Sequence, residues 1–412
     1  MSVNKQQVDV VKDKQTGNED LYRILNNFLD NMYEIKHFFD INLSAVKNRE
    51  TEFGDKFKKF MATHEREEKG KKLILVPLEE SEYFGKLLKD KSYIAHRPLL
   101  CNSSFLILIN NFEYITKSIL RKLFLTYPQS ILDKKDFIIE LEELCQFENL
   151  SEVKEFMIQR YLEKIFYKSF SEQRQILLKL FKYPEVQKHI KFDLLEQAIK
   201  SRNLLVHNNG IITEAFVKQT GRGNDGIGKK LFISKIEFEE VYQEILFFGV
   251  CFLVLLGDKI KDKEFLDKHY QQLLFSLLGR KEFVLLKRVY EATASYVISE
   301  DGISEVVNNI NYLLALKEIS DEKDKFYTLL KQYKTEQLSD HFKCAFAILK
   351  NDKKSFLKFL KNSDFTLADW YEFPIFDTLR EDEELTKKAL PILEKNTHGL
   401  GGIVLAIYMT RK

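Results

Sequence analysis

An arginine and a histidine five positions apart, Arg202 and His207, have types and spacing that suit chemistry on an anion. They lie in the stretch "AIKSRNLLVHNNGIIT", residues 198–213, with Asn203 directly after the arginine. A guanidinium keeps its charge, so Arg202 is expected either to pair with a carboxylate or to meet an anion from outside. A histidine transfers protons near neutral pH. The stretch is therefore a candidate site for proton transfer beside a bound anion.

A helix from Phe192 to His207 is predicted to position these side chains. At 100° per residue, one broad face collects the apolar residues, and Arg202 falls in the middle of that face. The apolar residues on it are Leu195, Ala198, Ile199, Leu205 and Val206. A charge at the centre of an apolar face is the feature that needs an explanation.

His207 is expected at the end of this helix, where the helix dipole stabilises an imidazolium. Asn203, one turn earlier, shares a face with His207, Glu196 and Lys200 and could orient the imidazole. Gly210 is predicted to supply the left-handed C-cap. Arg202 and His207 point about 140° apart, so two copies of the helix across a two-fold axis would aim both at one target more easily than one copy.

Composition predicts a mostly α-helical protein. The 412 residues are 44% hydrophobic, with only 6 Pro and 16 Gly. This length allows two or three domains and a core without metals or disulfides. The formal net charge is only +2, so contact with nucleic acid would have to come from a local basic patch.

Cysteine usage and hydropathy favour a cytoplasmic location. The four Cys residues are far apart, without a Cys-x-x-Cys pair, and three lie in apolar stretches, as expected of buried thiols in a reducing compartment. The polar start "MSVNKQQVDVVKDKQ" has no apolar core of a secretory signal. The longest apolar run, residues 245–257, is short for a membrane span and is predicted to be a core helix.

Three regions are expected along the chain. Residues 1–89 are an N-terminal helical segment, with two amphipathic helices between about 18 and 72 and a short extended connection after them. Residues 90–258 form a helical bundle, and residues 259–412 form a C-terminal array of short helices. Within the array, residues 345–360 around "KND" are similar to one helical hairpin of a solenoid repeat.

The central bundle is predicted to contain several helices and one small β-hairpin. The helices are expected at about 98–124, 135–146, 151–168, 171–182, 192–207 and 237–256. The alternating stretches "IITEAFVKQ" and "KKLFISK" are expected to pair around the glycine-rich "TGRGNDGIG". Arg222, Lys229 and Lys230 near that tip are candidates for contact with a phosphate backbone.

Other catalytic patterns are disfavoured. The string "GNDGIGKK" fits seven positions of a P-loop, but Lys230 stands where Ser or Thr would hold magnesium. Histidines and cysteines lack metal-ligand spacing, which argues against a metal-dependent nuclease. A Gly-x-Ser-x-Gly nucleophile elbow is also absent from the sequence.

The string "RNLLVH" resembles the Arg-x4-6-His motif of the HEPN superfamily, and Arg202, Asn203 and His207 match it. The resemblance covers about residues 90–258. It includes a helical bundle, a long apolar helix carrying Glu113, and a closing apolar helix. "HNNG" followed by a hairpin resembles in particular an uncharacterised bacterial branch often linked to phage defence.

The resemblance implies a metal-independent endoribonuclease without a cofactor, acting on RNA as a homodimer with a composite site. His207 would transfer protons, Arg202 would stabilise the transition state, Asn203 would orient the histidine, and Glu113 would partner Arg202. Lys200, Arg222, Lys229 and Lys230 would contact RNA. The implied role is that of a toxin or abortive-infection effector in antiviral defence. It would have a trigger or partner protein from the same system and no membrane association.

Two other interpretations stay open at this point. In the first, Arg202 is paired internally with Glu113 and His207 only caps its helix. In the second, the chain is a non-catalytic helical module that binds nucleotides or proteins through the same residues.

Overall fold

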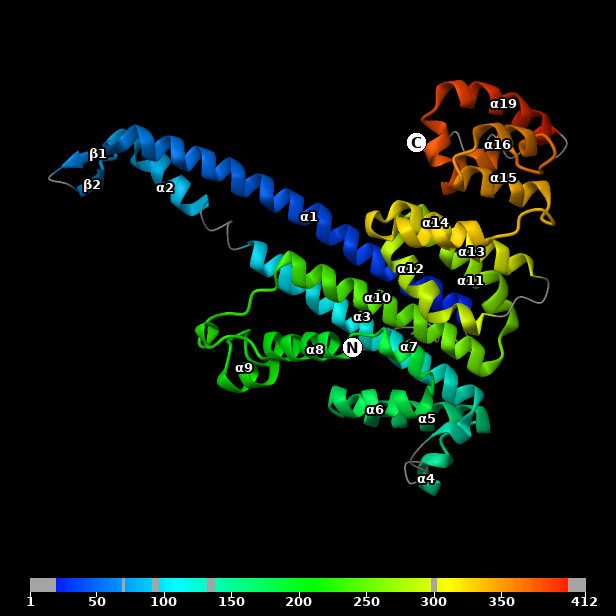
Figure 1. Ribbon diagram of the computed structural model, residues 1–412. Helices are drawn as coiled ribbons and strands as arrows, with labels where there is room; N and C mark the ends of the chain where they lie inside the picture. Colours follow the sequence, from blue (N-terminus) through cyan, green and yellow to red (C-terminus); the bar gives the residue numbers. More distant parts are fainter. Residues whose placement is uncertain (1–19, 69–70, 91–95, 132–137, 298–301, 399–412) are drawn as a thin grey trace, which may run out of the picture. The chain divides into compact units, whose positions relative to one another are not determined.

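The computed structural model describes residues 20–68, 71–90, 96–131, 138–297 and 302–398 of the chain. These residues are mostly helical, which confirms the all-α prediction (Figure 1). They divide into two compact units, Met1–Leu253 and Val254–Lys412. The N-terminal helices belong to the first unit, together with the predicted central bundle.

A single 44-residue helix, α1 (Leu21–His64), begins the first unit, so the prediction of two helices in this region is wrong. Asp20 caps it by accepting a hydrogen bond from the backbone N–H of Tyr22 at 3.3 Å. Residues 21–64 contain no proline and only one glycine, so nothing in the chain ends the helix early. The following elements are β1 (Glu65–Glu68), β2 (Lys71–Ile74), a 3₁₀ turn (Leu78–Glu80) and α2 (Ser81–Asp90), with β1 and β2 antiparallel.

Two long helices, α3 (His96–Thr126) and α10 (Lys235–Ile260), form the centre of the first unit with α1. The rings of Phe39 and Phe238 stack with centroids 3.9 Å apart, and Phe28 lies against Gly249, so α1 runs antiparallel to α10. On another side, the ring of Phe112 in α3 meets Phe248 edge to face at 5.0 Å. Aromatic side chains therefore join all three helices.

Helix α10 is buried on almost every side. Its residues from Ile245 to Phe248 and from Val250 to Leu256 are all 0% exposed. Among the described helices, α10 is the one that is long and apolar enough to cross a membrane. However, 89% of its most apolar window is buried inside the fold. This burial agrees with the predicted core helix.

Shorter helices complete the first unit, and most lie where the periodicity predicts them. They are α4 (Leu141–Leu144), α5 (Leu150–Phe166), α6 (Phe170–Leu180), α7 (Pro184–Lys188), α8 (Phe192–His207) and α9 (Glu214–Thr220). Of the helix predicted at 135–146, residues 135–137 lie outside the described residues, and of the rest only Leu141–Leu144 is helical. The short α7 was not predicted, although Pro184 at its first position is a typical start signal.

The β-hairpin predicted after residue 210 is wrong. Its first arm is helix α9, because the Thr213 hydroxyl caps a helical turn by accepting from the N–H of Phe216 at 3.2 Å. Gly221, read as part of a hairpin tip, is the left-handed C-cap of that helix, with φ +69°. Only an isolated bridge between Ile211 and Lys230 remains of the expected pairing in this described segment.

The second unit is an array of short helices that starts at the end of α10. A π-helix (Phe265–His269) leads into α11 (Tyr270–Gly279), α12 (Phe283–Thr293), α13 (Ile303–Glu318), α14 (Lys323–Gln332), α15 (Asp340–Leu349), α16 (Lys353–Leu360), α17 (Leu367–Glu372), α18 (Asp377–Arg380) and α19 (Glu383–His398). Helices α15 and α16 confirm the hairpin expected around "KND". Trp370 is a core residue, 1% exposed.

The burial of the cysteines also agrees with expectation. Cys101, Cys251 and Cys344 are buried and Cys145 is exposed. Burial raises the pKa of the Cys101 thiol and that of Cys344, so both thiols stay protonated at neutral pH.

Two glycine substitutions test the contact between α1 and α10. A Cβ at Gly249 would lie 2.4 Å from Cε1 of the buried Phe28 ring, so we expect Gly249→Ala to lower the free energy of unfolding by about 1–3 kcal/mol. A Cβ at Gly54 in α1 would have nothing within 4 Å. Because Ala favours a helix over Gly, Gly54→Ala should raise the free energy of unfolding by about 0.5–1 kcal/mol. Urea unfolding followed by circular dichroism measures both. Equal effects from the two variants would contradict the packing described here.

Candidate functional site

Helix α8 is fixed to the core at its first turn. The buried carboxylate of Glu244 in α10, 1% exposed, accepts a hydrogen bond from the backbone N–H of Lys191, the N-cap residue, at 2.9 Å. Phe192 packs edge to face on Phe248, with ring centroids 6.4 Å apart. Sequence reasoning missed Glu244, although a carboxylate inside an otherwise apolar helix is the signal that could have revealed it.

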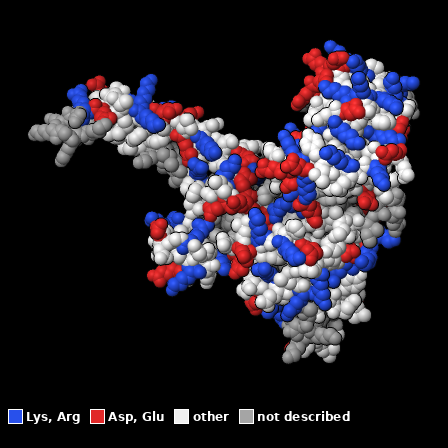
Figure 2. Space-filling model, viewed as in Figure 1, with Lys and Arg blue, Asp and Glu red and all other residues white. Residues whose placement is uncertain are grey.

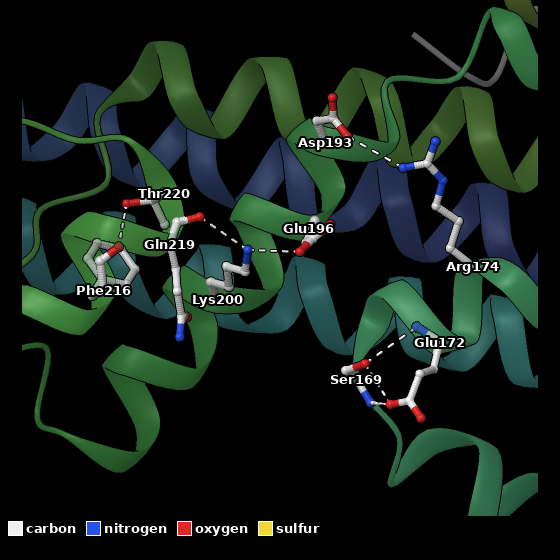
Figure 3. A network of polar contacts seen from close by, with 9 residues as sticks. All are labelled: Ser169, Glu172, Arg174, Asp193, Glu196, Lys200, Phe216, Gln219 and Thr220. Atoms are coloured by element: carbon white, nitrogen blue, oxygen red, sulfur yellow. Dashed lines mark hydrogen bonds and ion pairs between the residues drawn. The ribbon is translucent and has the colours of Figure 1, made fainter.

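Polar contacts on the outer side hold the middle of α8 (Figure 3). Near its start, Asp193 pairs with Arg174 of α6 at 3.5 Å. About two turns further, Lys200 pairs with Glu196 at 2.8 Å and donates to the backbone oxygen of Gln219, at the end of α9, at 3.2 Å. Lys200, predicted to contact RNA, therefore joins α8 to α9.

Arg202 lies at the edge of the buried face of α8 rather than at its centre. The buried residues recur at every third position and are Phe192, Leu195, Ala198, Ser201 and Leu204. A three-residue spacing drifts around the helix, so towards the C-terminus the buried side passes through Ser201. The Arg202 side chain is 25% exposed, and Val206, placed on the apolar face by the sequence, is 51% exposed. The prediction of Arg202 in the middle of an apolar face is therefore wrong.

The guanidinium of Arg202 has two partners. Its Nη2 lies 3.7 Å from Oε2 of Glu113 in α3, and Glu113 is 38% exposed. Its Nη1 donates to Oδ1 of the neighbouring Asn203 at 3.0 Å. A single long contact between half-exposed groups is a weak ion pair, worth about 0.2–1 kcal/mol. The structure thus brings Arg202, Asn203 and Glu113 together. The ion pair between Arg202 and Glu113 is weak enough for an incoming anion to displace the carboxylate.

Asn203 contacts Arg202 and not His207. Its side-chain oxygen accepts from the guanidinium, whereas the expected role was to orient the imidazole. His207 is exposed, and the described residues offer its ring no hydrogen-bond partner in this structure. It is the last residue of α8, about 7.5 Å along the helix axis from Arg202. Its imidazole is thus accessible to an incoming substrate.

The chain after His207 is fixed by backbone contacts. Asn209 and Gly210 are both left-handed, with φ of 48° and 72°, so the predicted C-cap glycine is the second of two such residues. The N–H of Gly210 donates to Leu204 O at 3.1 Å, and its carbonyl accepts from the N–H of Leu231 at 2.7 Å. The turn that presents His207 is therefore well defined.

Asn102 of α3 connects this turn to the bundle. Its side chain donates to Leu231 O at 3.1 Å and accepts from the N–H of Ile233 at 3.0 Å. Leu231 also contacts Gly210 at the end of α8. Glu113, eleven residues after Asn102 in α3, contacts Arg202, which lies earlier in α8. Helices α3 and α8 therefore run antiparallel. No pattern in the sequence pointed to Asn102.

The other predicted RNA-binding residues are not gathered around Arg202. Arg222 pairs with Glu237, which also caps the start of α10 by accepting from the N–H of Ser234 at 2.8 Å. Lys229 and Lys230 are exposed in the loop before α10. Of these three residues, the two lysines are the ones exposed without an ion pair in the described structure, whereas Arg222, 36% exposed, is paired with Glu237.

The visible surface carries charges of both signs. Over the face drawn in Figure 2, Lys and Arg side chains lie among groups of Asp and Glu side chains, and neither sign covers that face. This face therefore provides no broad positive field to attract a polyanion. Recognition of RNA on it would have to depend on local contacts.

Comparison with family models, with curated proteins and with solved structures finds no match to this chain. Within the described part of the chain, no group of three or more His, Cys, Asp or Glu side chains is arranged to hold a metal ion. The chemistry of the site is therefore argued from its own residues.

Unfolding measurements separate a structural from a functional role of Arg202. We expect Arg202→Met to change the free energy of unfolding by less than about 1 kcal/mol, because its ion pair is long and half-exposed. Glu244→Ala should lower it by about 2 kcal/mol, because the buried hydrogen bond to α8 is lost. Urea unfolding gives both values. If Arg202→Met lowered the free energy of unfolding as much as Glu244→Ala, the arginine would have a structural role in the bundle.

Proposed function

We propose that the first unit is a metal-independent endoribonuclease of the HEPN type. The observation that carries the proposal is the placement of Arg202 and His207. The arginine is at the surface of α8 in a weak ion pair, and the histidine is exposed at the end of the same helix. A core-facing, tightly paired arginine would have favoured a purely structural role.

RNA suits such a sparse site because it carries its own nucleophile. The 2′-hydroxyl attacks the adjacent phosphorus, the bond to the 5′-oxygen breaks, and the products are a 2′,3′-cyclic phosphate and a 5′-hydroxyl. His207 takes the proton from the nucleophile or gives one to the leaving oxygen. Arg202 stabilises the extra negative charge on the phosphorus oxygens.

Glu113 and Asn203 hold Arg202 ready in this mechanism. Asn203 fixes the guanidinium from its own helix, and Glu113 neutralises it until a phosphate takes the place of the carboxylate. The hydrogen bond to Asn203 assigns this residue to the arginine, so we revise its proposed role from orienting the histidine to positioning Arg202.

A homodimer through α3 and α8 is proposed to complete the site. Arg202 and His207 diverge by about 140° on one helix, so a phosphate meets both most simply when two protomers contribute. Large apolar side chains are exposed on the two helices: Ile107 at 49%, Tyr114 at 47% and Val206 at 51%. Such residues would be covered in a dimer of this kind.

The biological role that fits this activity is that of a toxin or abortive-infection effector in antiviral defence. A ribonuclease without a metal requirement acts wherever RNA is present, so its activity has to be controlled. The second unit is a suitable place for control by a trigger or partner protein.

Substitution of either residue tests the site. We expect the purified chain to cut total RNA in EDTA, and Arg202→Ala and His207→Ala each to reduce the rate by at least about 100-fold, because each removes a group that acts in the transition state. Gel analysis of the RNA measures the rate. Circular dichroism should show unchanged helix content in both variants.

Matched controls come from the same unit. Arg160→Ala removes another part-exposed arginine paired with a glutamate, and His37→Ala removes another exposed histidine. Both should cut like the wild type. Full activity in Arg202→Ala and His207→Ala would refute the site, and binding of RNA without cutting by the wild type would favour the non-catalytic binding module.

Mixing two inactive protomers tests the composite site. In a heterodimer of Arg202→Ala with His207→Ala chains, one of the two symmetry-related sites holds both an intact arginine and an intact histidine. We expect the purified heterodimer to regain about half of the wild-type activity. Each homodimer is the control. A monomeric wild type at the assay concentration would contradict the shared site. A heterodimer without activity would contradict a site built from one arginine and one histidine of opposite protomers, and is the result expected if all four groups are needed.

A further inference from the structure

A cavity of about 410 Å³ that opens to the surface lies in the second unit, far along the chain from the proposed catalytic residues. Helices α11, α13 and α15 and the residues around 365 and 373–375 line it. Its volume falls within the range of pockets that hold small organic molecules. Nothing in the proposed ribonuclease mechanism uses it.

One wall of the cavity is aromatic. The rings of Phe275 and Phe373 meet edge to face at 5.3 Å, and Phe373 meets Phe365 in the same way at 6.1 Å. The imidazole of His341 stacks on Phe365 with centroids 3.8 Å apart. Ring faces and edges held in this way suit contact with a planar ring.

A polar group on the opposite helix lacks a partner. Asn311 of α13 lines the cavity and is only 8% exposed, yet its Nδ2 has no hydrogen-bond partner in the structure. A buried amide N–H without an acceptor is unfavourable, so such groups are usually satisfied. In the present side-chain orientation Nδ2 is closed off even from a water-sized molecule, so its bond to a ligand needs a half-turn of the amide about χ2, which exchanges the amide nitrogen and oxygen. A ligand in the cavity with an oxygen or nitrogen acceptor would then satisfy the N–H.

The lining excludes a charged ligand. None of the side chains that line the cavity, all of them described residues, is Lys, Arg, Asp or Glu. Burial lowers the pKa of His341, so this imidazole is neutral at neutral pH. A phosphate or carboxylate in this place would have no counter-charge.

We propose that the second unit binds a small uncharged ligand whose planar ring packs on the aromatic wall formed by Phe275, Phe365 and Phe373 and whose acceptor takes a hydrogen bond from Asn311. The ligand class is a mostly apolar aromatic molecule with one carbonyl or ring-nitrogen acceptor. This proposal does not depend on the ribonuclease site.

A fluorescent probe of this chemistry tests the proposal on the full chain. Prodan is uncharged and carries a naphthalene ring with a ketone oxygen, and its emission moves to shorter wavelength when it leaves water. We expect saturable binding to the wild type. Asn311→Leu, which keeps the side-chain size, should weaken binding roughly threefold to tenfold, the effect of one lost hydrogen bond.

Two controls isolate that hydrogen bond. Asn308 lies on the same helix, and its buried Oδ1 also lacks a partner, but it does not line the cavity, so Asn308→Leu should bind prodan like the wild type. The probe 2-dimethylaminonaphthalene has the same ring without the carbonyl, so Asn311→Leu should not weaken its binding.

A third variant fills the cavity. Val307 is half-buried at its edge, and Val307→Trp should abolish binding of both probes while the helix content stays unchanged. Failure of the wild type to bind prodan, or equal binding by Val307→Trp, would overturn the cavity as the site. An unchanged prodan affinity in Asn311→Leu would overturn the proposed hydrogen bond.

Discussion

Burial of α10 on nearly all sides is the constraint on which the first unit depends. One helix supplies apolar contacts to α1 through Phe238, to α3 and α8 through Phe248, and to Phe181 through Phe252. Each fully buried phenylalanine contributes about 1.5–3 kcal/mol, so this helix provides much of the favourable free energy of the bundle. A helix that is apolar all round leaves its neighbours to provide the polar surface.

The position of the candidate site follows from this arrangement. Within the buried part of α10, Glu244 offers a carboxylate, and it binds the N-cap of α8. With its start fixed there and its end fixed by the turn at Gly210, α8 has little freedom to rotate. Arg202 is consequently held at the edge between α8 and α3, within reach of Glu113, while His207 stays in contact with solvent.

Helical periodicity was sufficient to predict α3, α5, α8 and α10, because apolar residues continue through them at 3.6-residue spacing, but it divided the 44-residue α1 into two helices. It failed where local capping decides the outcome: Thr213 starts a helix in a stretch whose alternation resembled a strand. It also misplaced Arg202, because the buried side of α8 drifts towards Ser201. Contacts between distant residues, such as those of Asn102 with the chain at 231–233, have no signal in a single sequence.

The chemistry of cleavage tests the central claim most directly. An RNA oligonucleotide with one mapped cut site would be compared in EDTA with the same oligonucleotide carrying a single 2′-deoxy nucleotide on the 5′ side of the cut. If the 2′-hydroxyl is the nucleophile, the RNA is cut to a 2′,3′-cyclic phosphate or 3′-phosphate end, and the 2′-deoxy substitution blocks the cut. Cleavage of both oligonucleotides, or cleavage only with magnesium to give 5′-phosphate ends, would contradict the roles assigned to Arg202 and His207.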